Sequence, residues 1–217
     1  IGSVFEKLQV VPLILLTLEA WQFRNAPQRA GNSFAHGEAF IFLLGVNFWN
    51  FLGAGMFGFL VNLPIVNYYE HGTYLTVNHG HAALMGVYGN LAIAMIVFCA
   101  RSLVEPARWN ARLLRCVFWS INVGLMGMVV LDLFPVGVAQ LMDVLENGLW
   151  HARSQVFVQG ALFQALTWAR IVGGAIFVLG GVLPLAWFVL TRSASLKTAQ
   201  PEPSLPPATR SVPEPSL

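Results

Sequence analysis

Charged residues are scarce in this chain. Asp, Glu, Lys and Arg together make up only 10% of its 217 residues, whereas apolar residues make up 56%. A soluble domain carries about 25% charged residues, so this composition excludes an ordinary water-soluble protein. The positive mean hydropathy, +0.64, agrees with that exclusion. The sequence therefore predicts an all-α, polytopic membrane protein whose main partner is the lipid bilayer.

Cysteines are few, and extended basic faces are lacking. Only Cys99 and Cys116 occur, each at the end of an apolar run and without a CxxC motif. This excludes a disulfide framework and gives no support to a zinc site, so we expect both to be ordinary apolar helix residues. The net charge is only +2, and the basic residues stand in short clusters between apolar runs, so no nucleic-acid partner is expected.

The two ends of the sequence have different characters. The chain begins at Ile1 without an initiator Met and without a basic segment followed by a cleavage site, so no targeting peptide is visible. We expect it to be the C-terminal part of a longer protein. Six prolines stand between Pro201 and Pro215, and we expect residues 193–217 to form a disordered tail after a membrane domain at 1–192.

Long stretches without charge predict the membrane helices. Three windows have at least the roughly 20 residues that a spanning helix needs, namely Ala39–Tyr69, His71–Ala100 and Ile171–Thr191. A fourth span is predicted at Cys116–Leu131, with an extension from Leu113 to Pro135. Leu8–Phe23 would be the first of about five spans. We expect its polar face, which carries Glu19, to contact other parts of the protein and not lipid. Residues 136–168 mix apolar and charged residues, which indicates a re-entrant or interfacial connection.

The distribution of basic residues predicts the orientation of these helices. Nine of the twelve Lys and Arg residues follow the first, third or fifth predicted helix. Since cytoplasmic loops carry an excess of Lys and Arg, we expect that side and the C-terminus to be cytoplasmic. Small residues in the second helix (Gly45, Gly53, Gly55, Gly58), with Asn47 and Asn50 among them, predict close packing and polar bridges between helices.

Two histidines stand inside one of the uncharged windows. His79 and His81 are separated by Gly80, and no Asp, Glu, Lys or Arg occurs between residues 71 and 100. Ionisable side chains inside membrane helices are costly and usually functional. Side chains at i and i+2 are rotated by about 200° and leave a helix on opposite faces. One helix could therefore ligate two metal centres, about 10 Å below its outer end.

Axial ligation of two haems is one function that fits this pair. A membrane helix presents a haem ligand as a single His facing an apolar slot. The neighbours Gly80, Ala82, Ala83, Gly86 and Gly89 are small enough for a flat macrocycle or another helix to approach. Two alternatives remain: histidines that hydrogen-bond across a helix bundle, and a haem-free transporter or channel in which the pair relays protons.

Other polar residues near the pair allow more than one role. Thr76 and Asn78 could cap a helix, pack in the bundle or hold a haem propionate. His71 could be a surface group, a proton relay or a propionate partner. No ligand role is expected for His36 or His151.

Three segments are long enough to be specific for one protein family. The first is 62–89, which contains the histidine pair. The other two are Phe48-Trp-Asn-Phe-Leu-Gly-Ala-Gly55 and Glu146-Asn-Gly-Leu-Trp-His-Ala-Arg-Ser154. Together they resemble bacterial nitric oxide reductase large subunits, in the haem-copper oxidase superfamily. The resemblance covers most of 4–191. The loop before the pair is closer to the quinol-dependent branch than to the cytochrome c-dependent branch.

The resemblance implies a fold, cofactors and a reaction. The chain would form the C-terminal helices of a twelve-helix or longer bundle in the bacterial inner membrane. His79 would ligate the high-spin haem b of the reaction site, and His81 the low-spin haem b that passes electrons in. The family reduces two molecules of nitric oxide to nitrous oxide and water, at a high-spin haem b facing a non-haem iron, with electrons from quinol or cytochrome c.

Some family features differ here or fall outside the sequence. The family holds its non-haem iron with three His and a Glu from preceding helices, so the iron and the second ligand of the low-spin haem are expected upstream. The chain alone is then not expected to be active. Asn90 stands where an apolar residue is expected, and 170–174 lacks the family's Pro and Asp. The rival enzyme is an oxygen-reducing terminal oxidase of the same superfamily, with copper in place of the non-haem iron.

Overall fold

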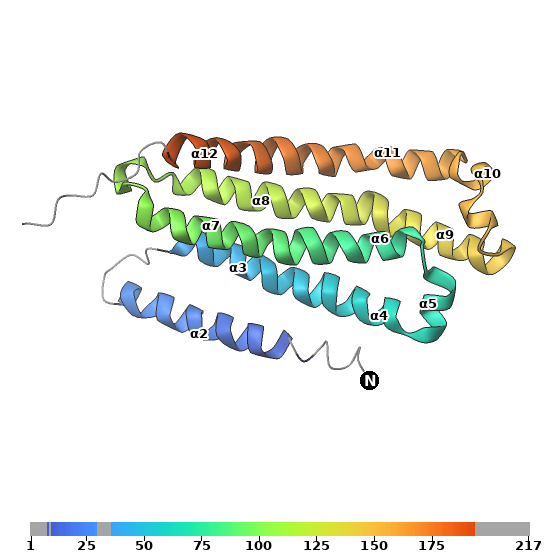
Figure 1. Ribbon diagram of the computed structural model, residues 1–217, viewed down its shortest axis with the longest axis horizontal. Coiled ribbons are helices and arrows are strands. Elements are labelled where there is room, and N and C mark those ends of the chain that lie inside the picture. The colour runs from blue at the N-terminus through green and yellow to red at the C-terminus, as the bar shows by residue number, and fades with distance from the viewer. Residues whose placement is uncertain (1–7, 9, 30–35, 194–217) are drawn as a thin grey trace, which may run out of the picture.

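All the elements that the structure describes are helices. The computed structural model of the protein describes residues 8, 10–29 and 36–193, and the long helices lie side by side as rods (Figure 1). The tail predicted to be disordered lies, from residue 194 onward, outside these residues. In chain order the elements are α2 (Val10–Arg29), α3 (Gly37–Trp49), η1 (Asn50–Phe57), α4 (Gly58–Asn62), α5 (Pro64–Glu70), α6 (Tyr74–His81), η2 (Ala82–Gly89), α7 (Asn90–Leu103), η3 (Pro106–Arg108), α8 (Ala111–Met128), η4 (Val129–Leu133), α9 (Phe134–Asn147), η5 (His151–Arg153), α10 (Gln155–Val158), α11 (Ala161–Ala175), η6 (Ile176–Val182) and α12 (Leu183–Ser193).

Four continuous helices are long and apolar enough to cross a membrane. Each consists of two α-helical parts joined by a π-helical segment, and together they cover Gly37–Asn62, Tyr74–Leu103, Ala111–Asn147 and Ala161–Thr191. The first predicted span is a shorter apolar helix, Val10–Gln22, within α2. The prediction of an all-α membrane bundle is therefore confirmed, with four long helices and one shorter one.

The helix that carries the histidine pair starts at a well-defined place. Pro64 holds Leu63 in extended backbone (φ −70°, ψ 125°), which separates α4 from α5. Thr73 then caps α6, because its hydroxyl accepts a hydrogen bond of 3.2 Å from a main-chain N–H in the first turn. At a rise of about 1.5 Å per residue, His79 and His81 lie roughly 8 and 11 Å from this end.

The fourth predicted span is longer than the sequence indicated. We expected it to end at Pro135, but the helix continues through this residue to Asn147. The π-helical segment η4 ends at Leu133, two residues before the proline, and a local change of helix geometry lets a membrane helix accommodate a residue without an N–H to donate. The prediction of an interfacial connection over 136–168 is therefore wrong for its first part.

The last helix starts earlier than predicted, at Ala161 instead of Ile171. The prediction placed Arg170 outside the span because of its charge. In the fold, Arg170 pairs with Asp132 of η4, with 2.8 Å between Nε and Oδ2. Charges inside membrane proteins are tolerated where they pair with one another. The connection between the last two long helices therefore comprises only residues 148–160.

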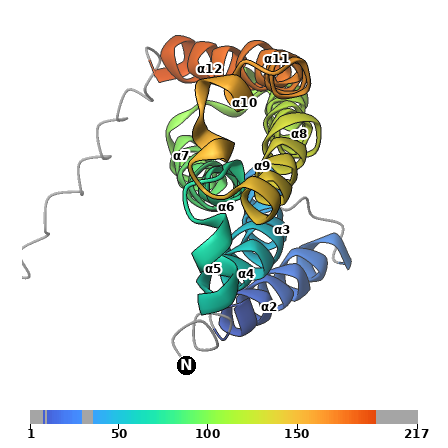
Figure 2. The same cartoon turned by 90° about the vertical axis from the view of Figure 1, so that its right-hand side faces the viewer.

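Helix 111–147 contacts the other three long helices, and in Figure 2 it lies beside helix 74–103, between α11 and α3. Trp49, Ala82, Leu125 and Leu133 are completely or almost completely buried in a cluster where three of these helices meet. The two cysteines are free and exposed on α7 and α8, as the sequence predicted for ordinary helix residues.

The shorter helix α2 packs on one side of α3 and η1. Asn47 of α3 donates a hydrogen bond to the Thr17 hydroxyl of α2, which confirms that an asparagine of this helix bridges to a neighbour. The expectation that Glu19 faces protein is not met within this chain, because Glu19 is exposed.

Candidate functional site

His79 is oriented by the neighbouring long helix. Its Nδ1 lies 2.9 Å from the main-chain carbonyl oxygen of Gly53 in η1. Because a carbonyl can only accept, Nδ1 carries the proton and Nε2 keeps its lone pair for another partner. Metal-binding histidines are usually oriented in this way, by donating the other ring N–H to a carbonyl or carboxylate.

Two glycines let the helix that carries His79 approach this closely. A Cβ atom at Gly53 would lie 2.5 Å from the Cβ of Ala82, and one at Gly58 would lie 2.9 Å from Cε1 of His79. Both distances are shorter than carbon atoms tolerate without a shift of the backbone or the ring. The small residues of helix 37–62 thus serve close packing, as predicted.

His81 has the same tautomer but different neighbours. Its Nδ1 donates a hydrogen bond of 3.0 Å to the carbonyl oxygen of Val77, one turn earlier, and its Nε2 is again left with a lone pair. On this side Asp132, in helix 111–147, is close enough for an electrostatic interaction with the imidazole. The two rings therefore leave their helix in different directions, as the i and i+2 spacing predicted.

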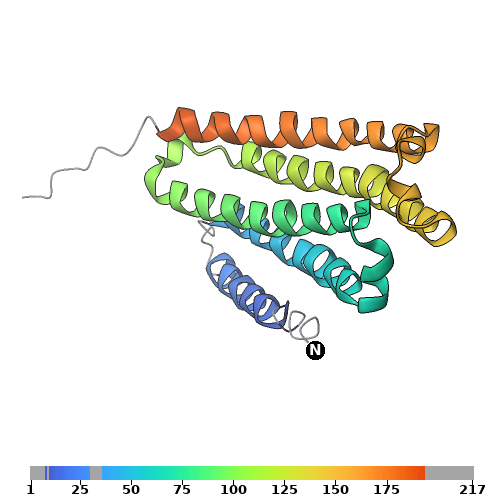
Figure 3. The ribbon, with the colours of Figure 1, turned by 45° about the vertical axis from the view of Figure 1, so that its right-hand side comes forward.

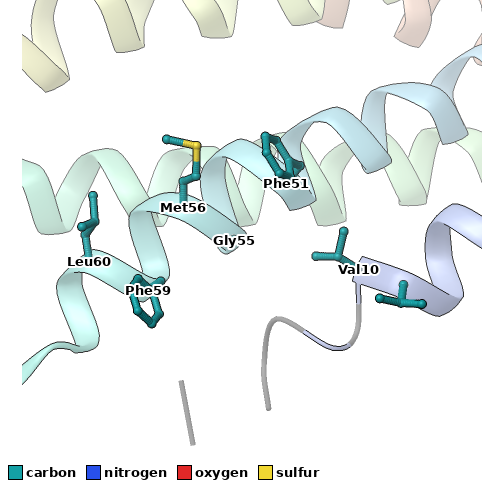
Figure 4. A pocket seen from close by; sticks show the side chains of 7 residues that line it. Val10, Phe51, Gly55, Met56, Phe59 and Leu60 are labelled. Carbon is teal, nitrogen blue, oxygen red and sulfur yellow. The ribbon is translucent and has the colours of Figure 1, made fainter. Parts of the chain in front are cut away.

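A cavity of about 470 Å³ opens beside His79. It lies between α2, helix 37–62 and helix 74–103, and its lining combines polar side chains, such as Asn50 and Tyr88, with small or apolar ones, such as Ala83. A second cavity, of about 490 Å³, lies between the start of α2 and helix 37–62 and is lined by Gly55 and apolar side chains (Figure 4). Of these two cavities, only the first is lined by a histidine.

Asn78 is completely buried beside His79, and neither atom of its amide has a hydrogen-bond partner among the described residues. An unpaired buried polar group costs about 1–3 kcal/mol, so this amide indicates a partner such as water or a ligand group. The helix-cap role considered for Thr76 and Asn78 is wrong, because Thr73 caps α6.

Glu70 ends α5 and is completely buried at the same end of the bundle. Its Oε2 accepts a hydrogen bond of 2.9 Å from the Thr76 hydroxyl, while Oε1 has no partner within the described part of the chain. Burial raises the pKa of this carboxyl above its ordinary value, although the Thr76 hydrogen bond and the nearby His71 and His79 lower it. No local pattern in the sequence singles out Glu70, because burial of one carboxylate in a short loop helix depends on tertiary packing.

Three residues missed by the sequence reasoning meet on the His81 side. Asp132 has no exposed surface and pairs with Arg170, which also donates a hydrogen bond of 3.3 Å to the Tyr74 hydroxyl. A signal for this cluster was present, because opposite charges in two membrane spans are expected to pair. We predicted the spans from uncharged stretches, in which Asp132 and Arg170 only mark boundaries, so the pairing of these two residues was not predicted.

The other histidines have structural contacts. His36 stacks on Phe98, with 4.5 Å between ring centroids, and His151 lies 2.8 Å from a carboxylate oxygen of Asp143. His71 is exposed and its carbonyl oxygen accepts a hydrogen bond from Arg153. In the described ranges no three His, Cys, Asp or Glu side chains come together in a group that could hold a metal ion.

The surroundings of the pair fit haem. Each imidazole has a free Nε2 in a half-buried position, and a haem iron takes such a nitrogen as an axial ligand. Gly80, between the two, has open space where a side chain would stand. The unpaired Asn78 amide supplies donors and an acceptor next to the ligand.

Comparison with known proteins identifies the family of this chain. Residues 1–176 match the family described as "Cytochrome C and Quinol oxidase polypeptide I". The chain is also 32% identical over 195 residues to a nitric oxide reductase subunit of Stutzerimonas stutzeri, an alignment that covers 87% of this chain and 40% of that protein. It thus spans about two fifths of the length of that relative. The chain is a multi-pass membrane protein that belongs to the cytochrome c and quinol oxidase polypeptide I family, within the haem-copper oxidase superfamily.

Proposed function

We propose that this chain provides axial haem ligands of a respiratory nitric oxide reductase. Nε2 of His79 would ligate the high-spin haem b of the reaction site, and Nε2 of His81 would ligate the low-spin haem b. One observation carries the proposal: two imidazoles on one helix point in different directions, each with Nδ1 bonded to a carbonyl oxygen and Nε2 free. The similarity to a nitric oxide reductase of another organism supports it.

The reaction would join two molecules of nitric oxide with two electrons and two protons, and give nitrous oxide and water. When bound, the haems would supply the path for electrons and an iron that takes nitric oxide. The carbonyl oxygens of Gly53 and Val77 would hold the two imidazoles in their ligating tautomers. The Asn78 amide would hold a haem propionate or an ordered water.

A non-haem iron would complete the reaction site. The ligands that the family uses for it, three His and a Glu, would come from parts of the protein other than this chain. The described residues of the chain would then contribute the haem side of the site. Quinol is the donor we propose, because of the loop before the histidine pair, with cytochrome c as the alternative.

We also propose that the histidine end of the bundle faces the outside of the bacterial inner membrane. The end of α7, the start of α8 and the end of α12 lie at the opposite end of the bundle (Figures 1 and 3). That end carries four arginines around the α7–α8 connection, Arg101, Arg108, Arg112 and Arg115. Their charges favour the cytoplasmic side, and would place the C-terminus there.

The test is an assay of the purified protein with nitric oxide or dioxygen as the electron acceptor, combined with a reduced-minus-oxidised spectrum and a metal analysis. We expect bands of b-type haem, iron without copper, and one nitrous oxide formed for every two nitric oxide consumed. Copper together with reduction of dioxygen alone would favour a terminal oxidase. The absence of any haem band would favour a transporter.

A further inference from the structure

An ion pair whose carboxylate is completely buried lies close to His81. Asp132 in η4 has no exposed side-chain surface, and its Oδ2 lies 2.8 Å from Nε of Arg170 in α11. The guanidinium carbon of Arg170 also stands 5.8 Å from the ring centre of Tyr74 in α6, and its Nη2 donates a hydrogen bond to the hydroxyl of that residue. Three long helices therefore meet at one pair of charges.

The geometry places this pair next to the proposed ligand of the low-spin haem. Tyr74 and His81 are seven residues apart, which is close to two helical turns, so both side chains leave the helix on the same face. Helix α6 packs directly against η4, the segment that contains Asp132. The Asp132 carboxylate is therefore near enough to His81 to act on it through space.

The two charges do not compensate each other completely. Oδ1 of Asp132 is buried without a hydrogen-bond partner among the described residues. The Arg170 side chain keeps 40% of its surface exposed, whereas Asp132 keeps none. A charge in a poorly polarisable interior acts over longer distances than one near water, because less solvent screens it. The carboxylate should therefore influence His81 and a group bound to it.

We propose that Asp132 and Arg170 set the reduction potential of the haem that His81 ligates. The inference rests on the proposed function, because it requires a haem at His81. The oxidised haem carries one positive charge more than the reduced haem, so a nearby carboxylate favours the oxidised form and lowers the potential. A nearby guanidinium has the opposite effect. Both are positioning residues that act on the haem through its ligand and the local field.

The test is a spectroscopic redox titration of the low-spin haem in the purified holoenzyme. Asp132→Asn should raise the midpoint potential, and Arg170→Gln should lower it. The double variant should lie between the two single variants and somewhat above the wild type, because it also removes the part of the carboxylate charge that Arg170 does not compensate. Tyr74→Phe leaves both charges in place and should shift the potential far less than either single change. Asp143→Asn, a change of another carboxylate on helix 111–147, is the matched control and should leave the potential unchanged.

Two results would overturn the proposal. In the first, the potential of the low-spin haem in Asp132→Asn and in Arg170→Gln equals that of the wild type; in the second, it shifts in the same direction in both variants. The second pattern would indicate loosened packing instead of an effect of charge. If Asp132→Asn does not accumulate, the sign of the shift in Arg170→Gln decides, since that side chain is partly exposed. Failure of the proposed function looks different: no low-spin haem is then present, or His81→Ala retains it.

Discussion

A hydrogen bond of 2.9 Å joins Nδ1 of His79 to the main-chain carbonyl oxygen of Gly53. The same glycine is in contact with Ala82, three residues after the histidine, and has no room for a side chain. Gly53 therefore admits the ligand helix and also accepts the bond that orients the imidazole. The proposed site consequently depends on the packing of helices 37–62 and 74–103.

Gly53→Ala should disturb this packing. The new Cβ would lie 2.5 Å from the Cβ of Ala82, so one helix must move, at a cost of about 1–3 kcal/mol. We expect lower thermal stability in detergent and a lower content of high-spin haem. Gly174→Ala is the control, because its Cβ would meet no atom within 4 Å. Equal stability and haem content in the two variants would contradict this role of Gly53.

A second prediction concerns the amides that join three helices in the core. The side chains of Asn90 and Asn122 exchange two hydrogen bonds of 3.2 Å, and Nε1 of Trp49 donates one of 2.8 Å to Asn122. Asn122→Leu leaves the other two without this partner, so we expect destabilisation by about 1–3 kcal/mol. Hydrogen bonds between membrane helices contribute less on average, about 0.6 kcal/mol. A loss near the upper end of this range therefore requires that the amides left without a partner are shielded from water.

A double-mutant cycle with Asn90→Leu separates the pair from the individual side chains. We expect the double variant to be more stable than the sum of the single effects, by roughly 0.5–2 kcal/mol. Additive effects would show that the two amides do not depend on each other. Asn90 is the position where the family resemblance led us to expect an apolar residue, so the cycle also shows what a polar side chain contributes there.

Stability should depend on the protonation of Glu70. Burial raises the pKa of this carboxyl in the folded protein, so its ionised form is disfavoured when the chain is folded. The stability that the protonated carboxyl contributes is fully present below the unfolded value, about 4.5, and is lost as the pH rises through the raised folded value. Glu70→Gln remains neutral, so it should gain stability relative to the wild type over this pH range.

The measurement is thermal unfolding of both proteins from acidic to neutral pH. Glu146→Gln serves as the control, because Glu146 is exposed at the same end of the bundle, and its curve should follow that of the wild type. A difference between Glu70→Gln and the wild type that stays constant with pH would rule out protonation of Glu70 as its cause.

Much of the fold could be predicted because uncharged windows and helix periodicity are local properties of the sequence. The long helix at 74–103 and the divergence of His79 and His81 follow from these alone. The passage of helix 111–147 through Pro135 could not be predicted, since it depends on the π-helical segment before the proline. The charge of Arg170 wrongly predicts a helix boundary because its partner, Asp132, lies 38 residues away.

The site was predicted less completely than the fold. The residue types at 79 and 81 indicated ligands, but their tautomers depend on which carbonyl oxygens the fold brings near them. The glycines of helix 37–62 predicted close packing, but the sequence did not show which helix packs against them. Burial of Glu70 depends on neighbours far along the chain, so the sequence could not distinguish it from a surface residue. For Asn78 the sequence left capping, packing and propionate binding open.

The most direct test of the central claim is to compare His79→Ala with His81→Ala in the purified holoenzyme by optical and electron paramagnetic resonance spectra. His151→Ala, a change of an exposed histidine that contacts Asp143, is the matched control. We predict that His81→Ala removes the low-spin haem signal and that His79→Ala alters mainly the high-spin signal. Loss of the same single signal in both variants, or of neither, would contradict the assignment of two haems to one helix.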